Sequence, residues 1–296
     1  MGVSTKLVHP DSLFKNLSGF FALYKPPDLN LINVLREMKF AFVKGTNESW
    51  NGNQKKIVKV TDNEITLEND ITSNFNCSGY RYIRKDFKID FLHPISEFNS
   101  GIIVGSVNTD KGYKIEKKPL IKAYHIKGRL GILTNDNTNR GSLIERATYT
   151  HVNRSKMDRM MSSIQSVYQR EILKNPTNVL GISEETYEEA SKGIIIPKST
   201  KTPPQIYDIK CIEFDRPFFK IEIQTINESE SFLINLIHSI GLRLRTYAIC
   251  VQIRRIKYGP IDLNSNCLLQ NEWKEFNKIL ENLKETNKTF QIKKFV

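Results

Sequence analysis

The sequence of 296 residues lacks the patterns that mark several common classes of protein. Its four cysteines form no CxxC pair, so neither a zinc knuckle nor a disulfide framework is predicted, and we expect reduced thiols in an intracellular compartment. No stretch approaches the run of about 18 apolar residues that a membrane-spanning helix needs. Residues 1–21 contain no arginine and are interrupted by Asp11, so they are weak as an organelle presequence.

Common active-site motifs are missing as well. The sequence contains no Walker loop and no GxGxxG, HExxH or GxSxG motif. Its five histidines show no metal-ligand spacing, so no metal site is predicted. His93 and Ser96 could suggest a base and a nucleophile, but nothing nearby marks a third orienting group or an oxyanion hole. The standard hydrolase, nucleotide-binding and metalloenzyme sites are therefore not indicated.

Positive charge is what the sequence has in excess. The 44 Lys+Arg against 32 Asp+Glu give a net charge of +12, which suits a partner that carries phosphates, with nucleic acid ahead of an anionic membrane. The first basic cluster comprises Lys111, Lys114, Lys117, Lys118, Lys122, Lys127 and Arg129. The second comprises Arg243, Arg245, Arg254, Arg255 and Lys257. Tyr113, Tyr124 and His125 interleave with the first cluster, and this mixture of cations and flat rings favours RNA over a merely solvated face.

The apolar pattern predicts a mixed α/β fold built on a largely antiparallel sheet. Strands are expected at 19–24, 101–105, 122–132, 205–214, 218–226 and 247–257, with another pair around 57–60 and 64–67. Helices are expected at 30–43, 152–172, 183–192, 229–244 and 271–284. We predict Ser229 as a helix N-cap, and a core-facing stripe formed by Met157, Met160, Met161, Ile164 and Val167.

No repeat or clear linker divides the chain, so one main domain is expected. We assign it to residues 19–273, with a polar, Asn-rich insertion at 44–80. Residues 1–18 form an N-terminal segment that is flexible or serves in targeting, and residues 274–296 form a C-terminal helix and basic tail.

Several segments in a fixed order resemble one family. These segments are GFFALYKPP, HPISEFNSGIIVG, KAYHIKGRLG, YTHVNRSKMDR, IHSIGLRLRT and CVQIRRIKYG. Together, over residues 19–273, they resemble the TruB family of RNA pseudouridine synthases, and within it the mitochondrial TruB-like paralogue of animals. The resemblance implies an α+β fold, with a largely antiparallel sheet flanked by helices, and no cofactor. Bacterial relatives add a C-terminal RNA-binding module, for which this chain ends too soon.

The family's chemistry implies a loop aspartate that attacks a flipped-out uridine, so that the base detaches, rotates and rejoins through carbon. Aligning Ser100 and the following glycine with the family loop puts Ser96 at the position of that aspartate. A serine hydroxyl is a poor nucleophile without an adjacent base, so the nucleophile is absent in this register. Glu97 could replace it if the loop slips by one residue, and Asp90 would need a larger shift.

Other family positions are partly retained. Tyr124 matches the tyrosine that stacks on the target base, and Lys25 belongs to the Lys-Pro pair that supports it. Phe232 and Ile234 fall on the family's Tyr-x-Arg, whose arginine pairs with the aspartate, so both members of that ion pair are lost. A buried arginine without its carboxylate would cost about 3–5 kcal/mol, and losing both avoids that penalty. The expected RNA-binding residues are Lys25, His93, Lys122, Lys127, Arg129, Arg254 and Arg255.

The leading hypothesis is an RNA-binding family member with weak or lost isomerase activity, mitochondrial by resemblance. Its expected partners are mitochondrial mRNA, rRNA or tRNA and proteins of mitochondrial RNA processing. The runner-up is an active pseudouridine synthase that uses Glu97 or a shifted loop. A third hypothesis is a non-catalytic, protein-binding scaffold. Salt-dependent binding to uridine-containing RNA would separate the first two from the third.

Overall fold

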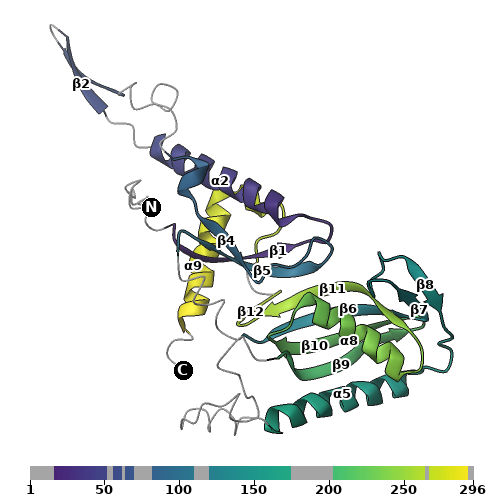
Figure 1. The fold of residues 1–296 in the computed structure, drawn as a ribbon. Coiled ribbons are helices and arrows are strands. Elements are labelled where there is room, and N and C mark those ends of the chain that lie inside the picture. The colour runs from purple at the N-terminus through teal and green to yellow at the C-terminus, as the bar shows by residue number, and fades with distance from the viewer. Residues whose placement is uncertain are drawn as a thin grey trace.

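A central eight-stranded sheet organises the chain, and it is largely antiparallel as predicted (Figure 1). The computed structural model describes residues 17–51, 56–61, 64–69, 82–109, 120–174, 203–263 and 267–292. The strand order is β1-β5-β11-β6-β10-β9, with β4 paired to β5 and β12 to β11. The strands are β1 (Gly19–Lys25), β4 (Ile89–Leu92), β5 (Ser100–Val107), β6 (Lys122–Leu130), β9 (Gln205–Asp215), β10 (Phe218–Ile226), β11 (Ala248–Tyr258) and β12 (Ile261–Asp262). Together with the helices described below, this sheet confirms the α+β class.

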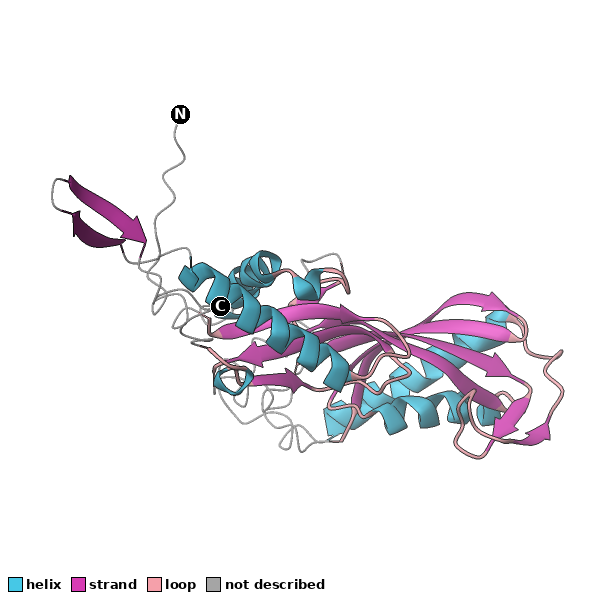
Figure 2. Cartoon of the chain, turned by 90° about the horizontal axis from the view of Figure 1, so that it is seen from above, coloured by secondary structure: helices cyan, strands magenta, loops and turns pink. Residues whose placement is uncertain are grey.

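One short parallel pairing joins the two halves of this sheet. β5 and β11 pair in parallel at Ser100 with Arg254 and at Gly101 with Arg255, whereas the other strand pairs are antiparallel. Gly101 has φ +128°, and a Cβ there would lie 2.3 Å from the carbonyl oxygen of Arg255. The glycine therefore allows the backbones of β5 and β11 to approach closely, and this pairing makes the two halves one continuous sheet (Figure 2).

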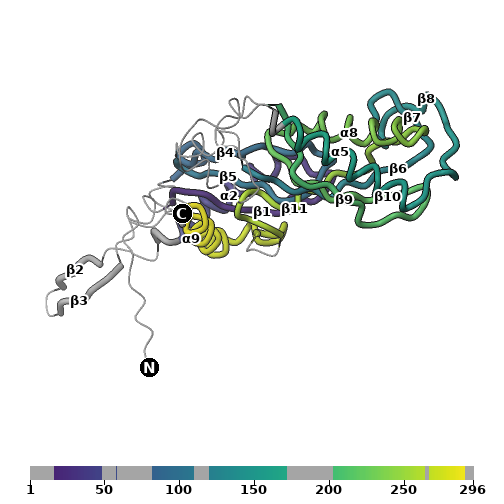
Figure 3. The backbone as a smooth tube through the Cα atoms, turned by 90° about the horizontal axis from the view of Figure 1, so that it is seen from below, coloured from purple at the N-terminus to yellow at the C-terminus, as the bar shows by residue number. Residues whose placement is uncertain are grey.

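The N-terminal half packs helices α2 (Leu31–Asn51) and α9 (Phe276–Ile292) around β1, β4 and β5. Val34, Met38 and Phe42 are buried in this core, as their spacing predicted. The expected end of the first helix at residue 43 was wrong, because α2 continues to Asn51 through the start of the predicted insertion. β1, from the early part of the sequence, and α9, from the late part, lie side by side in this half (Figures 1 and 3).

The C-terminal half packs α5 (Arg154–Lys174) and α8 (Glu230–Arg243) on one face of β6, β9, β10 and β11. Ser229 caps α8 as predicted, its Oγ accepting a 3.1 Å hydrogen bond from the backbone N–H of Phe232. The predicted core face of α5 is correct except at Val167, which is 39% exposed. Steps of three and four residues put Tyr168, not Val167, on the buried stripe.

Two small hairpins complete the described part of the chain. β2 (Lys56–Thr61) pairs antiparallel with β3 (Glu64–Asn69), which confirms the predicted strand pair. The expected strand at 122–132 instead breaks at Gly131, and β7 (Ile132–Thr134) and β8 (Leu143–Arg146) form an unpredicted hairpin. Short 3-10 turns lie at η2 (Arg84–Asp86) and η3 (Glu272–Lys274).

Some expectations fall outside the described residues. They are the helix at 183–192, nearly all of the N-terminal segment, and Lys111, Lys114, Lys117 and Lys118 of the first basic cluster. The division into domains stays a prediction. α9 is bonded to β1, since the side chains of Asn287 and Asn282 each accept a 2.9 Å hydrogen bond from a β1 backbone N–H. None of the described helices is both long and apolar enough to span a membrane.

Candidate functional site

The loop at residues 93–99 lies between β4 and β5, and Lys25 at the end of β1 fixes its backbone. The Nζ of Lys25 donates hydrogen bonds to the carbonyl oxygens of Glu97 at 2.6 Å and Asn99 at 2.7 Å. Lys25 is fully buried, and burial lowers the pKa of its amine while Glu230 and Glu97 oppose the change. The expected contact between Lys25 and RNA does not fit this conformation, because the amine is bonded inside the protein.

The carboxylate of Glu230 holds the same loop from the other side. Its Oε1 accepts a 2.7 Å hydrogen bond from the backbone N–H of Ser96 and a 3.0 Å bond from the side-chain amide of Asn99. Glu230 is the first residue of α8, where the free N–H groups of a helix favour negative charge. Asn99 in turn accepts a 3.3 Å bond from the backbone N–H of Ile253 in β11. The loop is therefore bonded to β1, α8 and β11.

A cavity of about 330 Å³ opens beside this loop. Ser96 and Ile234, which the sequence resemblance aligns with the family's aspartate and arginine, both line it. The structure thus brings the two aligned positions together, and neither carries a charge. Glu97 is exposed and does not belong to the described residues that line the cavity. The lining comprises Pro27, Asp28, Ser96, Phe98, Asn99, Thr138, Asn139, Arg140, Glu230, Ile234 and Cys250 to Ile253.

Tyr124 is buried in the sheet, and its hydroxyl group joins a polar network. It donates a 2.6 Å hydrogen bond to Glu228 Oε1 and accepts a 3.1 Å bond from Arg255 Nε. Lys122 also bonds Glu228 Oε1, at 3.0 Å. Burial raises the pKa of Tyr124 well above its ordinary value, although Arg255 opposes the shift, so the phenol is neutral. Tyr124 is not among the described residues lining the loop cavity, so its role in stacking on a base stays a prediction.

Three more of the expected RNA-binding residues belong to this buried network. Arg255 donates a 2.9 Å hydrogen bond to the carbonyl oxygen of His93, and His93 Nδ1 shares a 2.7 Å bond with the hydroxyl of Tyr258. Burial, aided by Lys122 and Arg255, lowers the pKa of His93 to about 3, so its imidazole is neutral. Burial also lowers the pKa of Lys122. In this conformation the side chains of His93, Lys122 and Arg255 are bonded inside the protein, so they are not available to bind RNA.

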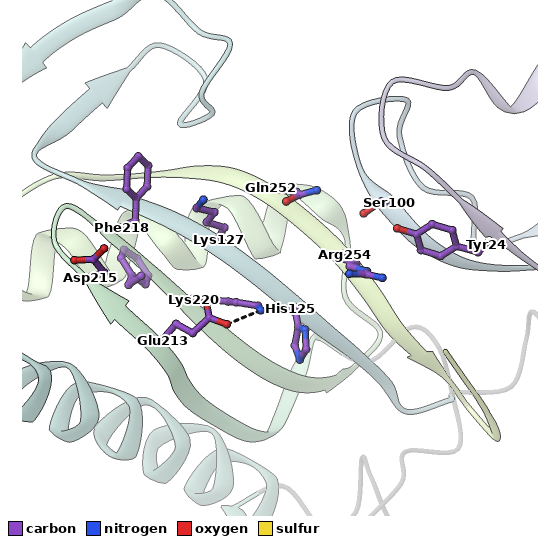
Figure 4. Close-up of a pocket in the computed structure, with 11 residues that line it drawn as sticks. Tyr24, Ser100, His125, Lys127, Glu213, Asp215, Phe218, Lys220, Gln252 and Arg254 are labelled. Carbon is purple, nitrogen blue, oxygen red and sulfur yellow. Dashed lines mark hydrogen bonds and ion pairs between the residues drawn. The ribbon is translucent and has the colours of Figure 1, made fainter. Parts of the chain in front are cut away.

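The remaining expected cations lie on the other face of the sheet. Successive strand residues point to opposite faces, so Lys127 projects away from the core that holds Ile126. Lys127 and Arg254 line a groove of about 420 Å³ that crosses β6, β10 and β11 (Figure 4). Lys127 Nζ lies 4.9 Å from the ring centre of Phe218, and the guanidinium of Arg254 lies 5.3 Å from that of Tyr24. Both pairs combine a cation with an aromatic ring in one groove.

The other polar groups around this groove mostly have partners. Lys220 and Glu213 form a 2.9 Å ion pair, drawn as a dashed line in Figure 4. His125 lies 3.2 Å from a carboxylate oxygen of Glu222. Arg129 does not line the groove, but its guanidinium lies 5.6 Å from the ring of Phe218, and its buried Nε has no bonding partner among the described residues. Among the described Lys and Arg residues that line the groove, Lys127 and Arg254 have no bonded carboxylate, whereas Lys220 has one.

Sequence reasoning missed the carboxylates that organise the site. Glu230 reaches a loop residue 134 positions earlier, and Glu228 reaches Tyr124 across 104 positions. No local pattern marks such long-range partners; the only available signal was their place at the start of a predicted helix. The His93–Ser96 pairing is not formed, since the Ser96 hydroxyl accepts from Asn99 at 3.0 Å. The described residues contain no group of His, Cys, Asp or Glu that could hold a metal ion.

Comparisons with known proteins find relatives over most of the chain. A family model described as TruB family pseudouridylate synthase (N terminal domain) matches residues 101–230. Mitochondrial pseudouridylate synthase TRUB2 of Rattus norvegicus is 32% identical over 271 residues, covering 87% of this chain and 82% of the relative. TRUB2 of Homo sapiens is 32% identical over 275 residues, covering 87% of this chain and 80% of the relative.

A solved structure supports the fold. It is the crystal structure of the archaeal box H/ACA sRNP Nop10-Cbf5 complex, with a TM-score of 0.50 and 14% sequence identity. The match covers 94% of this chain and 61% of the solved chain, and at this identity it speaks for the fold alone. Since the TRUB2 relatives share 32% identity over most of both chains, the protein belongs to the TruB family of pseudouridine synthases.

Proposed function

We propose that this protein binds RNA in mitochondria and has weak or no isomerase activity. One observation carries the proposal: the cavity beside the loop is lined by Ser96 and Ile234 where the family's chemistry requires an aspartate and its arginine. Without a carboxylate on the loop, the step that detaches uracil from its sugar has no nucleophile at the aligned position. The absence of both charges fits a site that lost them together, because a buried arginine without its carboxylate would destabilise the folded protein.

RNA binding is supported by charge and by the groove on the open face of the sheet. The net charge is +12, and Lys127 and Arg254 stand beside aromatic rings in the groove. Cations beside flat rings suit single-stranded or distorted RNA, since they bind phosphates and stack on bases. Relatives named as mitochondrial support a location in mitochondria. The proposed RNA partner is accordingly mitochondrial mRNA, rRNA or tRNA, with RNA-processing proteins as further proposed partners.

An active synthase that uses Glu97 is the competing proposal. The side chain of Glu97 is exposed, and its backbone carbonyl is bonded to the buried Lys25. A slip of one residue would have to break that bond and the bond between Ser96 and Glu230. Because a displacement of about 1 Å in a reacting group can cost about a hundredfold in rate, Glu97 receives little support from this geometry.

The test combines RNA binding with a chemical readout. Purified protein is incubated with mitochondrial tRNA, rRNA and mRNA fragments, binding is measured over a range of salt concentrations, and pseudouridine is mapped at base resolution. We expect binding that weakens steeply with salt and no site-specific pseudouridine. Site-specific modification that is abolished by Glu97→Gln but not by Ser96→Ala would overturn the proposal in favour of the active synthase. Absence of RNA binding would instead favour the scaffold.

A further inference from the structure

An arginine, Arg140, lies at the mouth of the loop cavity. Arg140, in the turn between β7 and β8, forms an ion pair with Asp28, in the turn after β1. Its guanidinium carbon also lies 3.4 Å from the ring centre of Phe98, which belongs to the loop. Arg140, Asp28 and Phe98 all line the cavity. Three segments that are distant in sequence therefore meet at this one side chain.

The geometry leaves Arg140 oriented yet accessible. When a guanidinium stacks on an aromatic ring, its N–H groups point outward in the guanidinium plane, parallel to the ring. There they can donate two parallel hydrogen bonds to an anion. The side chains of Arg140 and Asp28 are 51% and 67% exposed. Exposed ion pairs of this kind are weak because water and salt screen them, so another anion can replace the carboxylate. Phe98, itself 49% exposed, holds the arginine in position during such an exchange.

We propose that Arg140 is a phosphate-binding residue at the mouth of the cavity and that Asp28 occupies its guanidinium until RNA arrives. The ligand is a phosphodiester of the RNA backbone, which presents the planar pair of oxygens that a guanidinium matches. Each phosphate contact also releases counterions from the RNA, which favours exchange at low salt. This inference rests on the proposed RNA binding and adds a specific contact to it, in a cavity that shares Gln252 with the groove lined by Lys127.

The test measures the affinity of the full chain for a short, uridine-rich, single-stranded RNA. Asp28→Asn should tighten binding about two- to fivefold, because it removes the competing carboxylate. Arg140→Gln should weaken binding about five- to tenfold at low salt, and the slope of log K against log salt should become less steep by about 0.7. Glu48→Gln is the matched control, since it removes one carboxylate from an exposed ion pair with Lys44. Glu48 is near the far end of α2, roughly 25 Å from its start.

The double variant separates competition from a general change of charge. If Asp28 acts by occupying Arg140, then Asp28→Asn should bring no gain beyond that of Glu48→Gln once Arg140→Gln is present. Equal gains with and without Arg140, or a gain in Asp28→Asn no larger than in Glu48→Gln, would overturn the inference while leaving RNA binding intact. If the unaltered chain bound no RNA, the proposed function and this inference would fall together. Thermal unfolding checks that every variant is folded.

Discussion

Glu230 has the central place among the single residues of the site. Its carboxylate accepts hydrogen bonds from Ser96 and Asn99, and both donors belong to the loop. The loop is thus tied to α8 by an acceptor on the helix and donors on the loop. The sequence placed an uncharged pair, Ser96 and Ile234, beside this cavity, and its only sign of the Glu230 carboxylate was the position of Glu230 at the start of a predicted helix.

Removing that carboxylate should loosen the loop. Glu230→Ala leaves two loop donors without their acceptor, and hydrogen bonds to charged groups contribute about 1.5–3 kcal/mol each. Since the site is half-buried, we expect the free energy of unfolding in urea to fall by about 2–3 kcal/mol. Glu281→Gln, at an exposed site on α9, is the control and should change it by less than about 0.5 kcal/mol. An equally small effect of Glu230→Ala would show that the loop does not depend on this tether.

His93 should make part of the stability depend on pH. Its pKa is about 3 in the folded state against an ordinary 6.5, so folding favours the neutral imidazole. This contribution is fully present above about pH 6.5 and is lost as the pH falls toward 3. We therefore expect His93→Asn to lose less stability than the unaltered chain between neutral pH and pH 4, as measured by urea unfolding. Asparagine tolerates the φ of +46° at this position.

The control for that measurement is a histidine in a different setting. His151→Asn changes an exposed histidine whose Nε2 lies 2.9 Å from the carbonyl oxygen of Leu244. A pH dependence of His93→Asn no different from that of His151→Asn and of the unaltered chain would show that His93 is not the group whose protonation destabilises the fold.

At the scale of helices and strands, the periodicity of the sequence predicts which apolar residues are buried. It does not predict the hydrogen-bond partners of polar residues. The stripe of the first helix ends at Phe42, so nothing in it indicates that α2 continues to Asn51. After Phe42, the residues Thr46 and Asn47 are buried, and their side chains donate hydrogen bonds to carbonyl oxygens of the preceding helical turn. Asn47 also donates a 3.0 Å bond to the carbonyl of Tyr82, a partner that no local pattern predicts. Six of the eight strands of the central sheet were predicted from local alternation or a short apolar run, whereas the short strands β4 and β12 were missed.

The joint between β5 and β11 should be sensitive to a single methyl group. Gly101→Ala puts a Cβ against the backbone of Arg255 and forces an L residue to φ +128°. We expect at least about 3 kcal/mol of lost stability in urea unfolding, because neither backbone can move away easily. Gly259→Ala is the matched control: its φ is +55°, and the nearest atom to the added Cβ is a side-chain carbon at 3.4 Å. It should cost about 1 kcal/mol, and equal costs would contradict the close approach.

At the scale of the whole molecule, the candidate site is assembled from distant parts of the chain. Arg140 and Asp28 are 112 positions apart, and Asn99 and Ile253 are 154 apart. Charge clustering identified Lys127 and Arg254 as candidate RNA-binding residues, and they line one groove. The same clustering could not separate them from Lys122 and Arg255, which belong to the buried network, because neighbours in a strand face opposite sides of the sheet.

The groove should account for part of the salt dependence of RNA binding. Lys127→Gln and Arg254→Gln should each weaken binding to single-stranded RNA and reduce the slope of log K against log salt by about 0.7. Arg84→Gln is the matched control, since Arg84 also lies over an aromatic ring, that of Phe40, outside the groove lining. A common reduction in all three variants would mean that net charge, rather than the groove, determines binding.

If Ser96 leaves the loop without a nucleophile, RNA bound by this protein should gain no pseudouridine, and mapping at base resolution measures this. Mitochondrial RNA is incubated with an excess of the protein, under salt conditions in which binding has been demonstrated, and each uridine is read at base resolution. We expect bound RNA in which no uridine is converted beyond the level of a protein-free control. Conversion of a defined uridine, persisting in Ser96→Ala and lost in Glu97→Gln, would contradict it.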